Sequence, residues 1–302
     1  MLVQVIIPVH FPDQKFRACL TALKKQSMHD LRVLLIDSGS KQSDWLNLTH
    51  DLRAQIITID EGEFDHGGTR QMGVEYTADA DIHVFLTQDA VLSNENSLAR
   101  LIAVFEDPQI GCAYGRQLPH MDADFFSAHA RAFNYPAQSQ KRSYSDRKRY
   151  GVKTAFCSNS FAAYRYSALS EVGGFPRHTI LSEDMYVAAK MLQAGWSVAY
   201  AADATVKHSH NYTIAQEFRR YFDIGVFHER EAWIRADFGQ AEGEGTRFVQ
   251  NELCALLRHN LFLLPSMIAR DLSKLLGYRL GLVEHVLPRW IKQKMAMNKH
   301  FY

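Results

Sequence analysis

The chain has 302 residues, of which 47% are hydrophobic and 22% are charged. This composition is typical of globular proteins and excludes the disordered, collagen-like and disulfide-scaffold classes. The net charge of only +1 disfavours wholesale nucleic-acid binding. The charge is unevenly distributed, however, because residues 247–302 carry nine Lys or Arg against three Asp or Glu.

The sequence predicts neither a signal peptide nor a transmembrane segment. The first residues lack a basic stretch before their apolar run, which Pro8 soon interrupts. The longest apolar stretch near the end, residues 253–269, contains Arg258 and Pro265 and falls short of the ~20 apolar residues of a spanning helix. The four cysteines form no CxxC pair, which argues against a zinc knuckle or a dense disulfide framework and favours a reducing cytoplasm.

Apolar runs alternate with helical patterns up to residue 90. They predict strands over residues 3–9, 31–39, 54–60 and 81–90, and helices over residues 13–27 and 68–78. Strands separated by helices indicate a mostly parallel sheet, and such sheets bind ligands beyond the carboxyl ends of their strands. The polar residues that follow the apolar runs are therefore candidates for a binding site: His10, Asp37, Ser38, Gln88 and Asp89.

The middle of the chain contains one helix with an acidic start. Residues 140–151 are basic and aromatic and are predicted to form an exposed loop. A helix is expected to open after Ser182, a candidate N-cap, with Glu183 and Asp184 in the first turn, where the helix dipole favours carboxylates. A strand over residues 196–208 is expected to follow.

From about residue 213 to the end the pattern is helical. An acidic, glycine-rich break lies at residues 239–245. We place a boundary there, which divides the chain into a first domain, residues 1–238, and a basic amphipathic helical extension, residues 239–302.

Each polar cluster has a structural and a functional interpretation. Asp37 is either a turn former or a contact for the ribose or base of a nucleotide. Asp89, beside Gln88, is either a turn residue or an oxygen ligand for a divalent cation near a phosphate. HGGTR, residues 66–70, also has two interpretations. In the functional one, the glycines let the backbone approach a ligand and Arg70 makes a bidentate contact with phosphate or carboxylate. In the structural one, the motif is a turn before a helix.

Together these clusters resemble those of a known family. IIPVH, IDSGS, the TQD at 87–89, the Glu183–Asp184 pair and His208 resemble the motifs of family-2 glycosyltransferases with the GT-A fold, over about residues 3–230. FDHGGTRQMG, LTQDA and HSHNY resemble the bacterial rhamnosyltransferases that use dTDP-L-rhamnose to build O-antigen or other surface polysaccharide. The resemblance implies an α/β fold, with a mostly parallel mixed sheet flanked by helices and a C-terminal helical extension.

The resemblance also implies a donor site with a metal ion. Asp89 would occupy the last place of the family's DxD motif and ligate Mg²⁺ or Mn²⁺, with His208, or less readily His210, completing the metal site. The motif departs from the pattern, because Thr87 stands where the first aspartate is expected. The residues implied around the donor nucleotide are Pro8, Val9, His10, Asp37, Ser38, Gly67, Gly68, Arg70, Gln88 and Asp89.

On the acceptor side, the resemblance implies that Asp184 is the catalytic base of an inverting transfer. Such a base must reach the acceptor hydroxyl opposite the leaving nucleotide. Glu183 is interpreted as a positioning group, although both carboxylates would also complement the helix dipole. The remaining candidates for contact with acceptor or sugar are Asn159, Ser160, Trp196 and His210, and two further aromatic residues, Tyr200 and Tyr212, either stack on sugar or belong to the core.

The basic tail favours a membrane surface. Residues 247–302 combine apolar helical faces with Lys, Arg and Trp, which is typical of interfacial helices. The alternative is a helical appendage packed on the first domain or on a second subunit, so a homo-oligomer stays open. If the acceptor is linked to polyprenyl diphosphate, the enzyme must act at the cytoplasmic leaflet of the inner membrane, whose anionic lipids attract basic segments. The basic stretch 141–149 either holds the acceptor diphosphate or is a solvated loop.

We therefore expect an inverting, metal-assisted glycosyltransferase that moves L-rhamnose from dTDP-L-rhamnose to a hydroxyl of a lipid-linked or growing bacterial glycan. One alternative keeps the fold but uses UDP-galactofuranose, UDP-GlcNAc or another UDP-hexose. A nucleotidyltransferase would need a glycine-rich basic loop after the first strand, which IPVHFPDQ does not provide. A noncatalytic nucleotide-sugar-binding scaffold is disfavoured by the presence of Asp89, Asp184 and His208.

Overall fold

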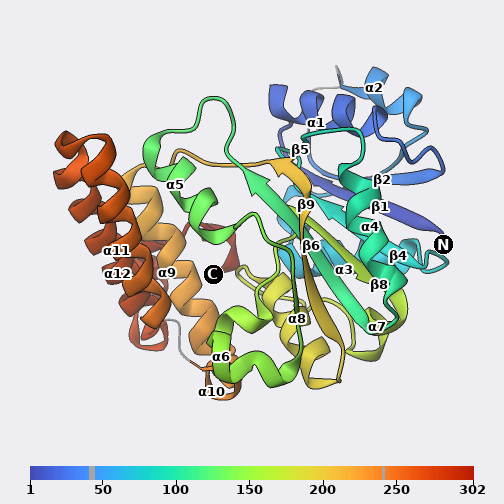
Figure 1. Ribbon diagram of the computed structural model, residues 1–302. Coiled ribbons are helices and arrows are strands. Elements are labelled where there is room, and N and C mark those ends of the chain that lie inside the picture. Colours follow the sequence, from blue (N-terminus) through green and yellow to red (C-terminus); the bar gives the residue numbers. More distant parts are fainter. Residues whose placement is uncertain (41–44, 240–241) are drawn as a thin grey trace.

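The computed structural model describes residues 1–40, 45–239 and 242–302, and in this part of the chain nine strands form one sheet (Figure 1). The strand order is β3-β2-β1-β4-β8-β6-β9-β5, and β7 also pairs with β9. The strands are β1 (Val3–Val9), β2 (Leu31–Ser38), β3 (Gln55–Ile59), β4 (Ile82–Leu86), β5 (Val91–Leu92), β6 (Ile110–Leu118), β7 (Gln140–Arg142), β8 (Phe161–Arg165) and β9 (Ser197–Lys207).

The strands of this sheet run mostly in one direction. β1 pairs in parallel with β2 and β4, β2 with β3, and β6 with β9. β8 is antiparallel to both of its neighbours, β4 and β6, so these two also share a direction. The carboxyl ends of β1, β2, β4 and β9 therefore lie at the same edge of the sheet as the amino end of β8. This confirms the predicted mostly parallel, mixed sheet.

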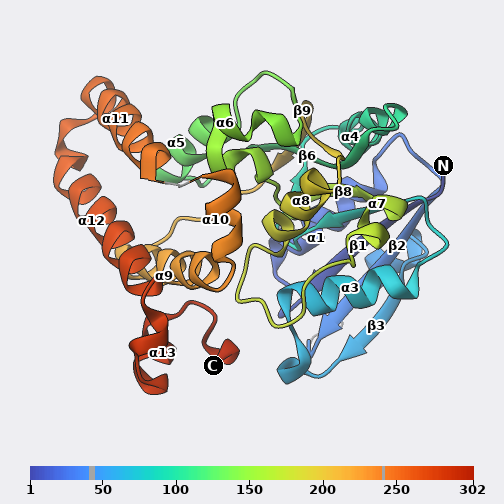
Figure 2. The same cartoon turned by 90° about the horizontal axis from the view of Figure 1, so that it is seen from below.

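Helices cover both faces of the sheet and form two cores (Figure 2). The alternation within β1 assigns its side chains to these cores, because Ile6 belongs to one and Val5 and Ile7 to the other. One face is covered by α3 (His66–Tyr76), α7 (Tyr166–Glu171) and α8 (Glu183–Gln193), and the other by α1 (Gln14–Lys24), α2 (Leu46–Asp51) and α4 (Ser97–Ala103).

A helical region lies beside the sheet (Figures 1 and 2). Its α9 contributes Phe222 and Val226 to the core under the sheet, so α9 packs with the first domain, and the boundary at residue 239 stays a prediction. Among the described residues, no helix combines the length and apolarity needed to cross a membrane. The helices are α5 (Phe125–Asn134), α9 (Ile214–Arg230), α10 (Ala232–Phe238), α11 (Glu242–His259), α12 (Leu264–Gly281) and α13 (Arg289–Met295).

The stretch at 140–151 is not the exposed loop that the sequence predicted. It forms β7 on the edge of β9, a 3₁₀ turn, and the short helix α6 (Arg147–Tyr150). The Tyr144 hydroxyl donates a hydrogen bond of 2.6 Å to Asp237 of α10, and the Arg147 guanidinium lies 3.8 Å from the Tyr144 ring centroid. These tertiary contacts order a segment whose composition alone resembles a loop.

Helices α9 and α12 pack backbone to backbone through glycines. A Cβ atom at Gly277 would lie 2.3 Å from the carbonyl oxygen of Phe218, and one at Gly281 would lie 2.2 Å from that of Phe222. Gly225 on α9 is equally close to α12, because a Cβ atom there would lie 2.3 Å from the carbonyl oxygen of Tyr278. The tail is therefore firmly joined to α9.

We predict that Gly277→Ala destabilises the protein by about 1–3 kcal/mol, because the added methyl group must push α12 away from α9. The control is Gly245→Ala in α11, where a Cβ meets nothing within 4 Å; there the higher helix propensity of Ala stabilises by at most about 1 kcal/mol. Urea unfolding of both variants measures the difference. Equal effects of the two substitutions would contradict the close packing.

Candidate active site

The sheet brings the predicted strand-end residues to one edge. His10 follows β1, Asp37 and Ser38 end β2, and His208 follows β9. Gln88 and Asp89 follow β4, and Asn159 and Ser160 immediately precede β8. Residues far apart in sequence meet here because the parallel strands end together and β8 begins where they end.

Hydrogen bonds tie the ends of β1, β2 and β4 together. The Gln88 side chain accepts from the backbone N–H of His10 at 2.8 Å and donates to its carbonyl at 2.9 Å. The His10 Nδ1 lies 3.1 Å from the Ser38 hydroxyl, which donates to the carbonyl of Val9. Asp37, mostly buried, accepts from the backbone of Ser40 at 3.1 Å. This end of the sheet is thus pre-organised, and the His10 side chain is exposed.

Asp89, His208 and His210 form a group able to hold a metal ion, with their ligand atoms within 4.8 Å of one another. Asp89 Oδ2 lies 3.5 Å from Nε2 of His208 and 3.6 Å from Nε2 of His210. Among the described residues this is the one such group of three or more His, Cys, Asp or Glu. His210 is therefore part of the group together with His208, whereas the sequence treated it as the lesser alternative.

The protonation of His208 suits a metal ligand. Its Nδ1–H donates to the Gln117 side-chain oxygen at 2.9 Å, since that oxygen can only accept. Nε2 therefore keeps its lone pair toward Asp89. Burial lowers the pKa of His208 to about 3, so the ring is neutral at physiological pH. Arg131 of α5 also donates to the Gln117 oxygen.

Sequence reasoning missed Gln117 and Arg131. Gln117 lies near the carboxyl end of β6, so its position at a strand end was the signal available. Arg131 lies inside a helix, where nothing in the local pattern distinguishes it from a surface arginine. Both act on the metal group only through the tertiary fold.

Asp184, in the first turn of α8, has the properties of a general base. The backbone N–H of Asn159 donates to its Oδ2 at 2.9 Å, and the residue as a whole is of intermediate burial. Burial, followed by the negative charge of Glu183, raises the pKa of Asp184 to about 7. A carboxylate with this pKa accepts a proton efficiently near neutral pH.

Glu183 and Arg70 form a buried ion pair beside Asp184. The guanidinium lies 3.1 Å from Glu183 Oε1, and both side chains are only 6% exposed. Asn159 donates to the same carboxylate oxygen at 2.8 Å. Although burial opposes ionisation, Arg70 lowers the pKa of Glu183 below its usual value. Glu183 therefore stays charged and faces Arg70, while Asp184 is the less buried residue of the two.

The HGGTR motif is used for internal packing. A Cβ at Gly67 would lie 1.8 Å from the carbonyl oxygen of Pro176, and one at Gly68 would lie 2.9 Å from the Asp65 carboxylate that caps α3. Arg70 donates to the carbonyl of His66 as well as facing Glu183. The sequence suggested that the glycines approach a ligand and that Arg70 pairs with a ligand's negative charge. In the structure, the glycines approach Pro176 and Asp65, and Arg70 pairs with Glu183.

Ser182 precedes α8 as predicted, but it does not cap the helix through its side chain. Its backbone is left-handed, with φ 61° and ψ 29°, and its hydroxyl makes no capping hydrogen bond. This conformation is uncommon for a residue with a Cβ and is characteristic of strained functional sites. It sets the direction in which the Glu183–Asp184 turn leaves the preceding chain.

Of the aromatic candidates, only Tyr212 lies beside the site, with its ring stacked on His210 at 5.1 Å between centroids. Trp196 precedes β9 while His208 follows it, and the 11 residues between them span roughly 35 Å, so Trp196 lies far from the metal group. Its Nε1–H instead donates to Glu171. Tyr200 stacks on Tyr114 at 5.0 Å within the core.

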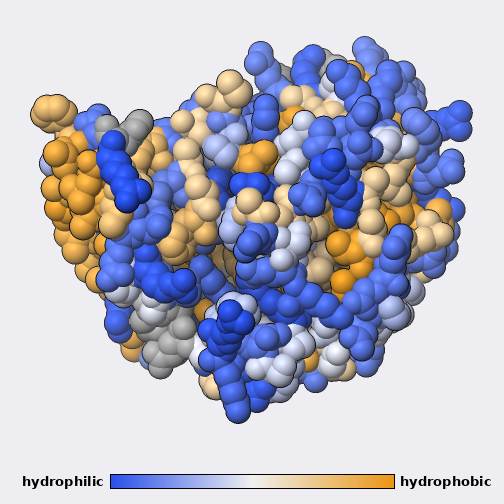
Figure 3. Space-filling model, viewed as in Figure 1, coloured by the Kyte–Doolittle hydropathy of each residue, from blue (hydrophilic) through white to orange (hydrophobic). Residues whose placement is uncertain are grey.

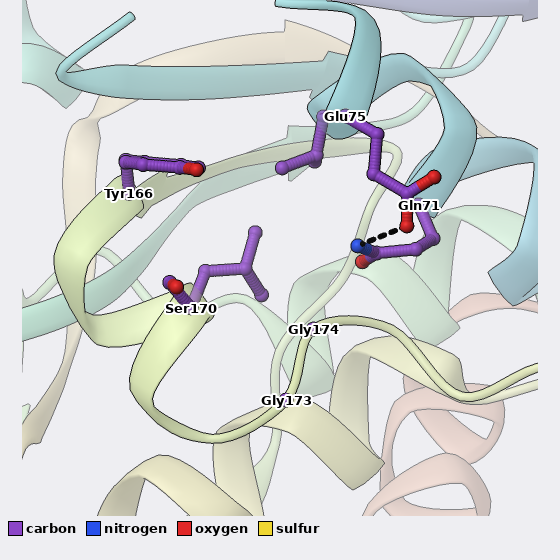
Figure 4. Close-up of a pocket in the computed structure, with 8 residues that line it drawn as sticks. Gln71, Glu75, Tyr166, Ser170, Gly173 and Gly174 are labelled. Carbon is purple, nitrogen blue, oxygen red and sulfur yellow. Dashed lines mark hydrogen bonds between the residues drawn. The ribbon is translucent and has the colours of Figure 1, made fainter. Parts of the chain in front are cut away.

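Two hollows are lined by residues near these elements. A polar one of about 250 Å³ opens beside His210, between Lys15, Asp122, Tyr212 and Gln216. Another, of about 220 Å³, lies between α3 and α7 and is lined by Gln71, Glu75, Tyr166, Ser170, Gly173 and Gly174 among others (Figure 4). The lining of the second hollow includes neither Asp184 nor the metal group.

Comparisons with known proteins identify the family. Residues 4–173 match the model of Glycosyl transferase family 2. The O-antigen chain rhamnosyltransferase RfbN of Salmonella typhimurium is 46% identical over 100% of this chain and 96% of its own length. The O-antigen chain rhamnosyltransferase WbaN of Salmonella anatum is also 46% identical, over 93% of this chain and 89% of its own length.

Solved structures confirm the predicted GT-A-type fold. The mannosyltransferase PcManGT from Pyrobaculum calidifontis, in complex with GDP-Man and Mn²⁺, gives a TM-score of 0.64 at 17% identity, covering 93% of this chain and 87% of that one. S. aureus TarS 1-349 in complex with UDP-GlcNAc gives 0.55 at 13% identity, covering 94% and 91%. The chain therefore belongs to glycosyl transferase family 2.

Proposed function

We propose that the protein is an inverting transferase that moves L-rhamnose from dTDP-L-rhamnose to a hydroxyl of a growing O-antigen glycan. The main support for this proposal is the position of Asn159 and Ser160 between Asp184 and His208. The Asn159 N–H lies 2.9 Å from the Asp184 carboxylate, while the Ser160 hydroxyl lies 3.5 Å from Nε2 of His208. A base and a cation-binding group thus flank one dipeptide. The names of the two full-length relatives support the sugar and the acceptor.

In this reaction, Asp184 removes the proton of the acceptor hydroxyl as its oxygen attacks the anomeric carbon of rhamnose. The bond from that carbon to the diphosphate oxygen breaks, dTDP leaves, and the configuration inverts. Glu183 holds no proton and contacts Arg70, so its part is to position the turn and to raise the pKa of Asp184 by its charge.

We propose that the donor nucleotide lies along the ends of β1 and β2. Pro8, Val9 and His10 would line it, and Asp37 and Ser38 would hold its base and ribose. Gln88, whose amide is engaged by the backbone of His10, would fix that edge rather than contact the nucleotide. Gly67, Gly68 and Arg70 are left out of this donor site, because their close contacts are internal.

Asp89, His208 and His210 would hold Mg²⁺ or Mn²⁺ beside the donor diphosphate. The neutral His208 ring, with its lone pair directed toward Asp89, fits this purpose. Two imidazoles in the ligand set favour Mn²⁺, since Mg²⁺ prefers oxygen ligands. A bound divalent cation would neutralise the charge that grows on the leaving diphosphate.

The Asp184→Asn variant tests the base. We predict that it lowers kcat with dTDP-L-rhamnose about 10²–10⁴-fold while dTDP binding, measured by calorimetry, is retained. In the wild type kcat should fall as the pH drops below about 7, because Asp184 acts as the carboxylate. Full turnover by Asp184→Asn would contradict the role of Asp184 as the base. Absence of turnover in the wild type would favour the noncatalytic scaffold, and turnover with a UDP-sugar alone would replace dTDP-L-rhamnose as the proposed donor.

The same raised pKa has an effect on stability. The folded state retains a proton on Asp184 that the unfolded chain, whose carboxyl has its ordinary pKa of 3.8, releases. As the pH rises from about 4 to about 7, the unfolding free energy of the wild type should therefore decrease relative to that of Asp184→Asn. A difference in unfolding free energy that does not change with pH would contradict the raised pKa.

Removal of the metal provides a separate prediction. Treatment with EDTA should lower turnover by about a hundredfold or more, and Mn²⁺ should restore it at lower concentrations than Mg²⁺. Asp89→Asn should remove this response. Full turnover in EDTA would contradict a metal-assisted transfer.

We further propose that the tail docks on the cytoplasmic face of the inner membrane, where a polyprenyl-diphosphate-linked acceptor would be presented. Figure 3 has an apolar strip over α11 and α12. Its large exposed hydrophobic residues are Leu257, Leu261, Phe262, Ile268, Leu272, Leu275 and Leu276. Exposed cations on the same helices, Arg258 and Arg279, and on α13, Arg289 and Lys294, suit anionic headgroups.

We predict that the double substitution of Leu272→Asp and Leu276→Asp lowers co-sedimentation with phosphatidylglycerol vesicles at least about tenfold, because it places charge in the apolar strip. The control is Tyr76→Asp, an equally exposed hydrophobic residue on α3. Unchanged co-sedimentation of the double variant would favour a tail that packs only against protein.

A further inference from the structure

The segment between β9 and α9, residues 208–213, carries both histidines of the metal group but has no regular secondary structure. We call it the histidine segment. A segment without a hydrogen-bonded ladder depends on side chains for its conformation. The groups that hold the histidine segment therefore also decide where His208 and His210 lie.

Helix α5 and the loop before it hold one side of the histidine segment. The backbone N–H of His120 donates to the hydroxyl of Ser209 at 2.9 Å. The side-chain oxygen of Asn211 accepts from the N–H of Asp124 at 3.0 Å and from the hydroxyl of Ser127 at 2.8 Å. These contacts fix the residues on either side of His210.

Arg270 of α12 holds the other side. Its Nη1 donates to the carbonyl of Tyr212 at 2.7 Å and to the carboxylate of Glu217 at 2.8 Å. Its Nη2 lies 3.9 Å from Asp124, and the guanidinium lies 4.5 Å from the Phe126 ring centroid. The Arg270 side chain is only 12% exposed. One guanidinium thus joins α12, the start of α9, the histidine segment and α5.

His210 depends on this support more than His208 does. His208 is buried and its Nδ1 is fixed by Gln117. The His210 side chain is 38% exposed, and its described contacts are Asp89, the edge of His208 and the stacked ring of Tyr212. Tyr212 therefore orients His210, and Arg270 fixes the backbone of Tyr212.

We infer that Arg270 is a positioning residue for the metal group, which acts through Tyr212 on His210. The C-terminal extension is thereby part of the active site. The inference rests on the proposed function, since it concerns the metal group assigned there. A lysine cannot replace Arg270 fully, because a single ammonium lacks the planar fork that engages several acceptors at once.

The test is a titration of each purified full-length variant with MnCl₂, with free Mn²⁺ measured by electron paramagnetic resonance. Arg270→Met should raise the Kd for Mn²⁺ about tenfold or more, as loss of outer-shell support does. Arg270→Lys should rescue part of this loss. The matched control is Lys292→Met, which breaks another largely buried ion pair of the extension, that with Glu284 at 2.5 Å and 16% exposure.

The outcomes separate this inference from the proposed function. If the wild type binds no Mn²⁺, the metal group and the role of Arg270 are both overturned. If Asp89→Ala abolishes binding while Arg270→Met binds like the wild type, only the role of Arg270 is overturned. An equal loss in Lys292→Met would also overturn it, since general loosening would then be the cause. Should Arg270→Met not fold, the test uses Arg270→Lys instead. An Arg270→Lys variant that binds Mn²⁺ as tightly as the wild type would then overturn the inference.

Discussion

The buried ion pair between Arg70 and Glu183 is the constraint on which the position of Asp184 depends. It joins α3 to the first turn of α8, and separating its charges would leave one of them buried and unpaired at a cost of several kcal/mol. The same carboxylate accepts from Asn159, whose N–H holds Asp184. The charge of Glu183, which anchors the turn, also adds to the effect of burial in raising the pKa of Asp184, the proposed base.

The direction of the strands explains why scattered motifs converge. β1, β2, β4 and β9 end at one edge, and β8 begins there because it runs antiparallel to its neighbours. Asn159 and Ser160 therefore lie between a residue after β9 and a residue at the start of α8. An all-parallel arrangement would place the start of β8 at the far edge, and this link between Asp184 and the metal group would be lost.

Patterns local in sequence predicted much of this arrangement. The strand-end polar residues and the acidic start of α8 were correctly located, because hydrophobic periodicity fixes strands and helices. Gln117 and Arg270 were not identified, since their importance arises from partners 91 and 58 residues away along the chain. The close approach of Gly67 to Pro176, and the length of β9 that separates Trp196 from His208, were likewise not predictable from the local pattern.

Several of the basic residues of the tail face the protein interior, although the composition of the tail suggests that its charges face a membrane. Arg270 and Lys274 face inward with Glu217, as Lys292 of α13 faces Glu284, and all three side chains are at most 16% exposed. These cations hold protein elements together and are not available to lipid. Leu272 and Leu276 lie on the outer face of the same helix. One helix therefore carries the proposed membrane contact and the support of the metal group, so the two functions share a single structural element.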